Sequence, residues 1–173
     1  MDQVRRKRIR LPASNYKAGW YFVTICTDHR TNFLANVTPT VGADDSVRPC
    51  VALEGYTSRL TPIGLAVREC LERLTDAVHG VLVDKYIIMP NHVHAIICLS
   101  AGTGGQSRPP LQGVIQRFKS VSTRQGWKHG VKKLWQRSFF DHVIRCEEEY
   151  RRIWQYIDDN PAKWAEDEYY SAE

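Results

Sequence analysis

The feature that most constrains this 173-residue sequence is a pair of apolar stretches joined at Pro90-Asn91, within residues 86–99. The β-branched and aromatic residues on both sides of Pro90-Asn91 predict two strands connected by a turn. Because side chains alternate between the two faces of a strand, His92 and His94 should stand side by side on one face. Two neutral imidazoles with this spacing can bind a single metal ion. Two solvated histidines on a half-exposed strand are the alternative.

The rest of the chain predicts an α+β fold. Residue types predict a strand over 19–27 and another within 134–144. Thr61-Pro62 is typical of a helix start, and apolar residues recur at helical spacing up to His79-Gly80. Further helices are expected from Leu111 and over 147 to about 160. The order β-α-β-β-α-β is the ferredoxin-like antiparallel sheet with helices on one face, here followed by an additional C-terminal helix. Residues 35–56 have weak periodicity, which indicates a loop with a short strand near 51–53.

Length and composition fit one domain over 18–173, preceded by a basic N-terminal arm over 1–17. No apolar run is long enough to span a bilayer, and no apolar segment follows the basic N-terminus, so we expect a cytoplasmic protein that does not bind membranes. The five cysteines are scattered and include no Cys-x-x-Cys pair, which predicts reduced thiols rather than a disulfide framework.

Positive charge is concentrated in two segments, although the net charge is only +5. Residues 101–140 contain eight Lys or Arg and no acid, and the N-terminal arm is also basic. Such clustering is typical of a surface that binds nucleic acid, with a solvated helix and a disordered tail as the alternative. The candidates for phosphate contacts are Arg5, Arg6, Lys7, Arg8, Arg10, Arg117, Lys119, Arg124, Lys128, Lys132, Lys133 and Arg137. Trp127 and Trp135 are candidates for base stacking.

The last predicted helix presents a phenol and a carboxamide together. Tyr156 and Asn160 are four residues apart and therefore lie one turn apart on one side of the helix. If this helix docks on the face that carries His92 and His94, the Asn160 carbonyl oxygen can be a third metal ligand. Tyr156 would then point at the group that the metal polarises. The alternative is a surface tyrosine and a helix-terminal asparagine.

Two motifs carry a resemblance to a known family. Residues 89–94, Met-Pro-Asn-His-Val-His, resemble the His-hydrophobic-His motif of single-tyrosine HUH transposases, which move single-stranded DNA. Residues 156–161, Tyr-Ile-Asp-Asp-Asn-Pro, resemble the tyrosine helix of the REP-associated branch of that family. The similarity extends to residues 21–27 and 134–142, and so over most of the chain.

The resemblance implies a metal-dependent single-stranded DNA endonuclease and strand transferase acting on hairpin-containing, REP-like DNA, as a monomer or a homodimer. In this reading Tyr156 is the nucleophile that forms a covalent 5′-phosphotyrosine. His92, His94 and Asn160 hold Mg²⁺ or Mn²⁺, whereas ligand preference alone would also admit zinc. Asn160 stands where other branches of the family have glutamine. Two alternatives stay open: a non-cleaving DNA- or RNA-binding module, and a zinc hydrolase that adds a carboxylate to the two histidines.

Overall fold

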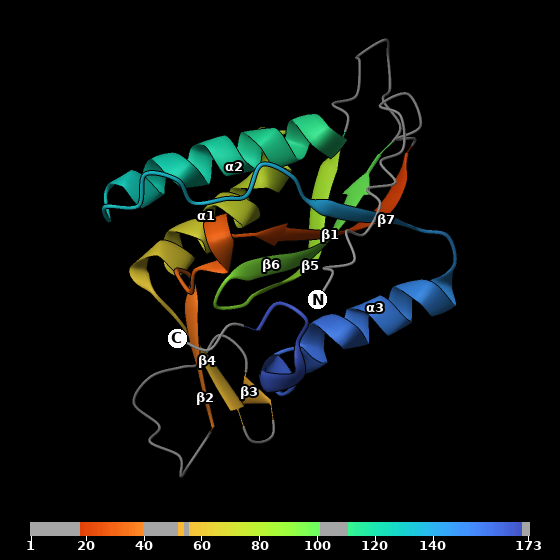
Figure 1. Ribbon diagram of the computed structural model, residues 1–173. Helices are drawn as coiled ribbons and strands as arrows, with labels where there is room; N and C mark the ends of the chain where they lie inside the picture. Colours follow the sequence, from red (N-terminus) through yellow and green to blue (C-terminus); the bar gives the residue numbers. More distant parts are fainter. Residues whose placement is uncertain (1–17, 40–51, 54–55, 101–110, 171–173) are drawn as a thin grey trace, which may run out of the picture.

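A four-stranded antiparallel sheet forms the centre of the computed structural model, which describes residues 18–39, 52–53, 56–100 and 111–170 (Figure 1). The strand order is β5-β6-β1-β7, with β1 at Gly19–Cys26, β5 at Val81–Ile88, β6 at His92–Leu99 and β7 at Phe140–Ile144. Helices α1 (Pro62–Ala77) and α2 (Leu111–Trp127) cover one face, and helix α3 (Glu147–Asp159) lies on the other. The basic arm, with Arg5 to Arg10, lies outside the described residues.

The larger core lies between the sheet and helices α1 and α2. Alternate residues of β1 and β6, such as Val23 and Ala95, face this layer and are fully buried. Helix α1 begins where the sequence predicts, because the Thr61 hydroxyl accepts a hydrogen bond of 3.0 Å from the backbone N–H of Gly64. Burial of alternate strand residues leaves the opposite side chains, including both histidines of β6, on the face toward α3.

Helix α3 rests on the second face through a small apolar cluster around Ile157 and through several polar contacts. Ile157 is the only buried residue of this helix, whereas Trp154 is 38% exposed. The Lys85 ammonium lies 2.5 Å from the Asp158 carboxylate and 3.6 Å from the Trp154 ring centroid. The Tyr150 hydroxyl donates a hydrogen bond to Asp84. These contacts from β5 fix how the helix sits along the sheet.

The structure differs from the sequence expectation in two segments. The expected loop over 35–56 contains strand β2 (Ala35–Pro39), which the sequence did not predict, whereas β3 (Ala52–Leu53) lies where a short strand was expected; both pair with β4 (Tyr56–Leu60) in a separate three-stranded sheet. The expected strand over 134–144 is regular only in β7. In its irregular first part Trp135 is buried against α2, where its indole N–H donates to Ser122. Trp135 is therefore not available for base stacking.

Two short 3₁₀ helices, η2 (Asp28–Arg30) and η3 (Trp164–Glu166), complete the described elements. Within the described part of the chain no helix is long and apolar enough to cross a membrane. The cysteines of this part are free thiols, as the sequence predicts.

Candidate metal centre and nucleophile

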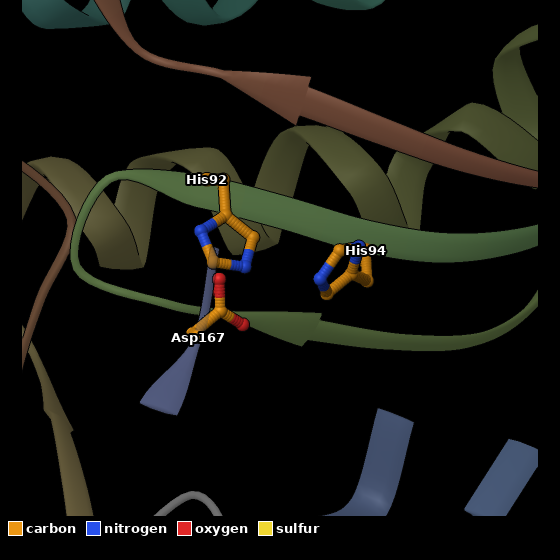
Figure 2. A group of neighbouring side chains, drawn as sticks. All are labelled: His92, His94 and Asp167. Atoms are coloured by element: carbon orange, nitrogen blue, oxygen red, sulfur yellow. The ribbon is translucent and has the colours of Figure 1, made fainter. Parts of the chain in front are cut away.

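His92 and His94 lie side by side on β6, facing α3 (Figure 2). Their ring centroids are 4.5 Å apart, and the two residues are 0% and 1% exposed. The prediction that they share a face is confirmed, and the alternative of two solvated histidines is wrong. Buried polar groups require partners, so the contacts of each ring nitrogen define what the pair can do.

The Nδ1 atom of each ring already has a partner. His92 Nδ1 lies 3.0 Å from the Oδ1 of Asn91, and His94 Nδ1 lies 2.9 Å from the Thr24 hydroxyl. The Asn91 amide N–H groups donate to the backbone carbonyls of Arg30 and Tyr169, which fixes the amide orientation and leaves Oδ1 as an acceptor. His92 Nδ1 therefore carries the proton, and its Nε2 keeps a lone pair for a ligand.

Both imidazoles are neutral at pH 7. Burial lowers the pKa of His94 to about 3. Burial, followed by the neighbouring His94 and Arg30, holds the pKa of His92 well below its usual value. Neutral imidazole is the protonation state that binds metal ions. The pair is therefore ready to bind a cation without first losing protons.

The Asp167 carboxylate completes a three-residue cluster that the sequence did not identify. One ligand atom each of His92, His94 and Asp167 lies within 4.8 Å of the others (Figure 2). Asp167 follows η3, in a segment without periodicity, so no sequence pattern indicates its position. Burial is the main cause that raises the pKa of Asp167. An ion bound beside it would reverse this effect, because a cation favours the charged carboxylate.

Backbone contacts hold the segment that carries Asp167 over the histidines. The Asn91 amide donates to the Tyr169 carbonyl at 2.8 Å, and the Arg30 guanidinium donates to the Glu168 carbonyl at 3.1 Å. Arg30 has a left-handed backbone, with φ of 57°, and its guanidinium lies 5.1 Å from the Tyr169 ring centroid. These contacts link the turn after β1 and the start of β6 to the last described residues. Asp167 therefore reaches the site through tertiary contacts rather than through local sequence.

Asn160 lies in the same cluster, at the end of α3. It is 2% exposed, and it lies near enough to His92 and Tyr156 to influence the pKa of each, although burial is the main cause of both shifts. Among the described residues, neither Oδ1 of Asn160 nor Nε2 of His92 has a hydrogen-bond partner, although both atoms are buried. Buried polar atoms left in this state are costly, and a bound cation would satisfy both. The structure thus brings Asn160 to the histidines, while its role as a ligand stays a prediction.

The Tyr156 hydroxyl lies 3.4 Å from Nε2 of His94, and the residue is 42% exposed. Its ring meets that of Phe22 edge-on, with centroids 6.0 Å apart. Burial, and then the negative charge of Asp167, raises the pKa of this phenol. The hydroxyl is therefore protonated at neutral pH, next to the atoms that would bind a metal. One side of the ring remains open to a substrate.

These donors fit a divalent metal ion. Two imidazole nitrogens, one carboxylate and one amide oxygen suit Mn²⁺, and the oxygen donors also suit Mg²⁺. Two histidines and one carboxylate are equally a known zinc set. The residues therefore define a possible metal site without fixing the ion.

The predicted phosphate-binding residues of α2 lie on the opposite face of the sheet from the histidines. The Lys119 ammonium donates to the backbone carbonyls of Gln136 and Ser138, and Lys133 lies 2.8 Å from Asp28. The other predicted phosphate contacts in the described chain, on α2 and in the segment after it, are exposed: Arg117, Arg124, Lys128, Lys132 and Arg137. Their contact with DNA stays a prediction, and the structure does not bring the α2 cations to the metal centre.

Comparisons with known proteins point to transposases. No family model matches the chain. A Haemophilus influenzae protein named only as uncharacterized is 28% identical over an alignment of 183 positions, gaps included, which covers 95% of this chain and 93% of that protein. The REP-associated tyrosine transposase of Escherichia coli K12 is 28% identical over 81 residues, or 47% of this chain and 44% of that protein. The solved structure of a REP-associated tyrosine transposase bound to a REP hairpin covers 94% of this chain and 74% of its own length, with a TM-score of 0.58 and 21% identity, a likeness of fold.

Proposed function

We propose that this chain, which is transposase-like and related to the REP-associated tyrosine transposases, is a metal-dependent single-stranded DNA endonuclease and strand transferase. The observation that carries the proposal is the position of the Tyr156 hydroxyl, 3.4 Å from Nε2 of His94. A nucleophile beside a metal ligand can attack a phosphate that is held by the same metal. The β-α-β-β-α-β order of the central elements supports the ferredoxin-like assignment.

In the proposed reaction the Tyr156 oxygen attacks the phosphorus of a phosphodiester. A Tyr156–phosphorus bond forms, and the bond from phosphorus to the 3′ oxygen breaks. The phenolic proton leaves to solvent, which reaches the half-exposed ring, and the departing 3′ oxygen takes a proton from water. The product is a 5′-phosphotyrosine, and attack by a 3′-hydroxyl reverses the step to join strands. The phosphotyrosine ester retains the energy of the broken phosphodiester bond, so no nucleotide cofactor is needed.

His92, His94 and Asp167, with Asn160, would hold the ion, which we propose is Mg²⁺ or Mn²⁺. When bound, the ion supplies a Lewis acid that polarises a non-bridging phosphate oxygen. Asn91 and Thr24 keep Nε2 of each histidine directed at it, as outer-shell partners do in metal sites. Tyr156 lies beside histidines of its own chain, which supports cleavage by a single protomer.

The proposed substrate is single-stranded DNA next to a hairpin. This follows the relative whose structure holds a REP hairpin. We propose that exposed cations of the chain, such as Arg124 and Lys128, contact the phosphates of such DNA.

The test uses a hairpin oligonucleotide with single-stranded flanks, labelled at its 3′ end, in the presence of Mn²⁺. Attack by Tyr156 attaches the downstream fragment to the protein, so the 3′ label should migrate with the protein in a denaturing gel. Tyr156→Phe should form no adduct, whereas Tyr150→Phe, on the same helix, should form it. An equal adduct with Tyr156→Phe would contradict the proposal. Hairpin binding without an adduct in any metal would select a non-cleaving binding module.

A zinc hydrolase is a second candidate, and Asp167 is the observation that favours it. Two histidines and one carboxylate leave an open position for a water, as catalytic zinc sites do. Metal analysis of the purified protein separates the two functions. Stoichiometric zinc, together with hydrolysis that survives Tyr156→Phe, would replace the transposase proposal.

A further inference from the structure

Phe140 is an exposed phenyl ring on the edge of the sheet, on the same face as the metal centre. It is 52% exposed and begins β7, the strand at one end of the order β5-β6-β1-β7. In the sheet register Phe140 pairs with Thr24, and Thr24 pairs with His94. Paired residues of antiparallel strands point to the same face. Phe140 therefore stands in line with the metal ligand, two strands away, with its ring open to solvent.

A row of aromatic contacts joins this ring to the reactive atoms. The Phe140 and Phe22 rings meet edge-on, with centroids 6.4 Å apart. Phe22 stacks on His94, with centroids 5.3 Å apart and planes inclined by 27°, and it also meets the Tyr156 ring. Phe22 thus supports three rings at once. The exposed ring at the end of this row is one residue removed from the proposed nucleophile.

Two exposed cations lie close to members of the row along the chain. Arg137 precedes Phe140 by three residues, and Arg152, whose side chain is 78% exposed and lies 3.8 Å from the Glu149 carboxylate, is one helical turn before Tyr156 on the same side of α3. Exposed aromatic rings together with cations are typical of surfaces that bind single-stranded nucleic acid, because a ring stacks on a base while the cations contact phosphates. The contact of the row with Tyr156 favours a nucleic acid over an apolar protein partner, because the proposed nucleophile acts on DNA.

We propose that Phe140, supported by Phe22, is the stacking platform for the unpaired base beside the cleaved phosphate. The proposal rests on the proposed function, since it places the strand through its phosphate at Tyr156. Bases inside a duplex are covered on both faces by their neighbours, so an unpaired base can lie on the ring where an internal paired base cannot. Phe140 is thus a positioning residue that sets which nucleotide presents its phosphate to Tyr156, and it takes no part in the bond changes.

The test measures binding separately from cleavage. In a Tyr156→Phe background, Phe140→Ala, Phe140→Trp and Leu65→Ala are compared by fluorescence anisotropy with a labelled oligothymidylate. Leu65 is the matched control, since it is 44% exposed but lies on α1, across the sheet. Loss of one base stack should weaken binding roughly 5- to 150-fold in Phe140→Ala, and Phe140→Trp should retain the affinity. Leu65→Ala should change it less than about 2-fold.

A second measurement locates the contact. Oligothymidylate carrying one iododeoxyuridine should crosslink under ultraviolet light to the peptide that contains Phe140, and the crosslink should disappear in Phe140→Ala. A series of oligonucleotides should each carry one abasic nucleotide at a different position. One position should weaken binding to the protein that retains Phe140, and no position should weaken the binding of Phe140→Ala further.

Each result separates this proposal from the proposed function. Equal binding by Phe140→Ala and Leu65→Ala would overturn the stacking platform and leave cleavage by Tyr156 intact. If Phe140→Ala weakens binding but the protein with its native Tyr156 forms no covalent adduct, only the cleavage proposal would be overturned. A change in oligomeric state in Phe140→Ala, with DNA binding unchanged, would show that the ring contacts a second copy of the chain and would overturn the platform.

Discussion

Replacing Asp167 by asparagine separates a metal ligand from a merely structural carboxylate. The backbone N–H of Tyr169 donates a hydrogen bond to Oδ1 of Asp167, at 2.6 Å, and the asparagine side chain keeps an oxygen that can accept it. It removes one negative charge from a cluster whose ligand atoms lie within 4.8 Å of one another. Opposite unit charges about 4 Å apart attract by about 4 kcal/mol at an effective dielectric constant near 20. Part of this gain is offset by the desolvation of the carboxylate, whose pKa burial already raises.

We therefore expect Asp167→Asn to weaken Mn²⁺ binding by about 2–3 kcal/mol, which is roughly 30- to 150-fold. The same variant should be at least as stable as the parent toward urea without metal. The sign follows from the pKa: a carboxyl group with a raised pKa in the folded state destabilises the fold once it is ionised, and asparagine cannot ionise. A structural role would instead lower stability and leave metal binding unchanged.

Isothermal titration with Mn²⁺ and urea unfolding without metal measure the two effects. Glu166→Gln is the matched control, because Glu166 is an exposed acid of the same segment and loses the same charge. Its affinity should change less than about 2-fold. Binding by Asp167→Asn within 2-fold of the parent would refute the role of the carboxylate. If Asn160→Ala then lost the metal, the ligand set would be the two histidines and the amide.

Three further predictions concern supporting contacts. Thr24→Val removes the hydroxyl bonded to His94 and should weaken Mn²⁺ binding roughly 10-fold by calorimetry, whereas unchanged affinity would show that the ring needs no such support. Tyr150 donates to Asp84, which raises the pKa of Tyr150 to about 12. Tyr150→Phe should cost about 0.5 kcal/mol in urea unfolding up to about pH 10, and this difference should vanish as the pH rises through about 12, so a constant difference would contradict it. A Cβ at Gly64 would lie 1.9 Å from a backbone carbonyl oxygen, so Gly64→Ala should lower the unfolding free energy by about 3 kcal/mol, and a loss under about 1 kcal/mol would show that the backbone yields.

The sequence predicts the histidine pair because a strand has a period of two residues, which places His92 and His94 on one face whatever packs against it. It predicts that Tyr156 and Asn160 share a side of α3 for the analogous helical reason. Both statements are local. That α3 docks over the histidines is a tertiary fact, and the resemblance to a family supplied it.

Asp167 could not be predicted, because its position depends on hydrogen bonds between segments distant in sequence, such as the one from Asn91 to Tyr169. The charge of Lys119 was visible in the sequence, but its use as a donor to backbone carbonyls was not. Composition likewise gives the number of tryptophans without showing that Trp135 is buried. Charge and residue type state what a side chain can do, and packing decides whether it is exposed to do it.

Helix α3 has few buried side chains, and this has a consequence for the proposed exchange of DNA ends. Helix α1 buries five residues, including Val67 and Leu71, whereas α3 buries Ile157 alone. Segments with few buried apolar contacts open at a lower free energy than the rest of a fold. The amide protons of α3 should therefore exchange with deuterium before those of α1. If Tyr156 is the nucleophile, as proposed, movement of this helix away from the sheet would carry one DNA end aside while another enters.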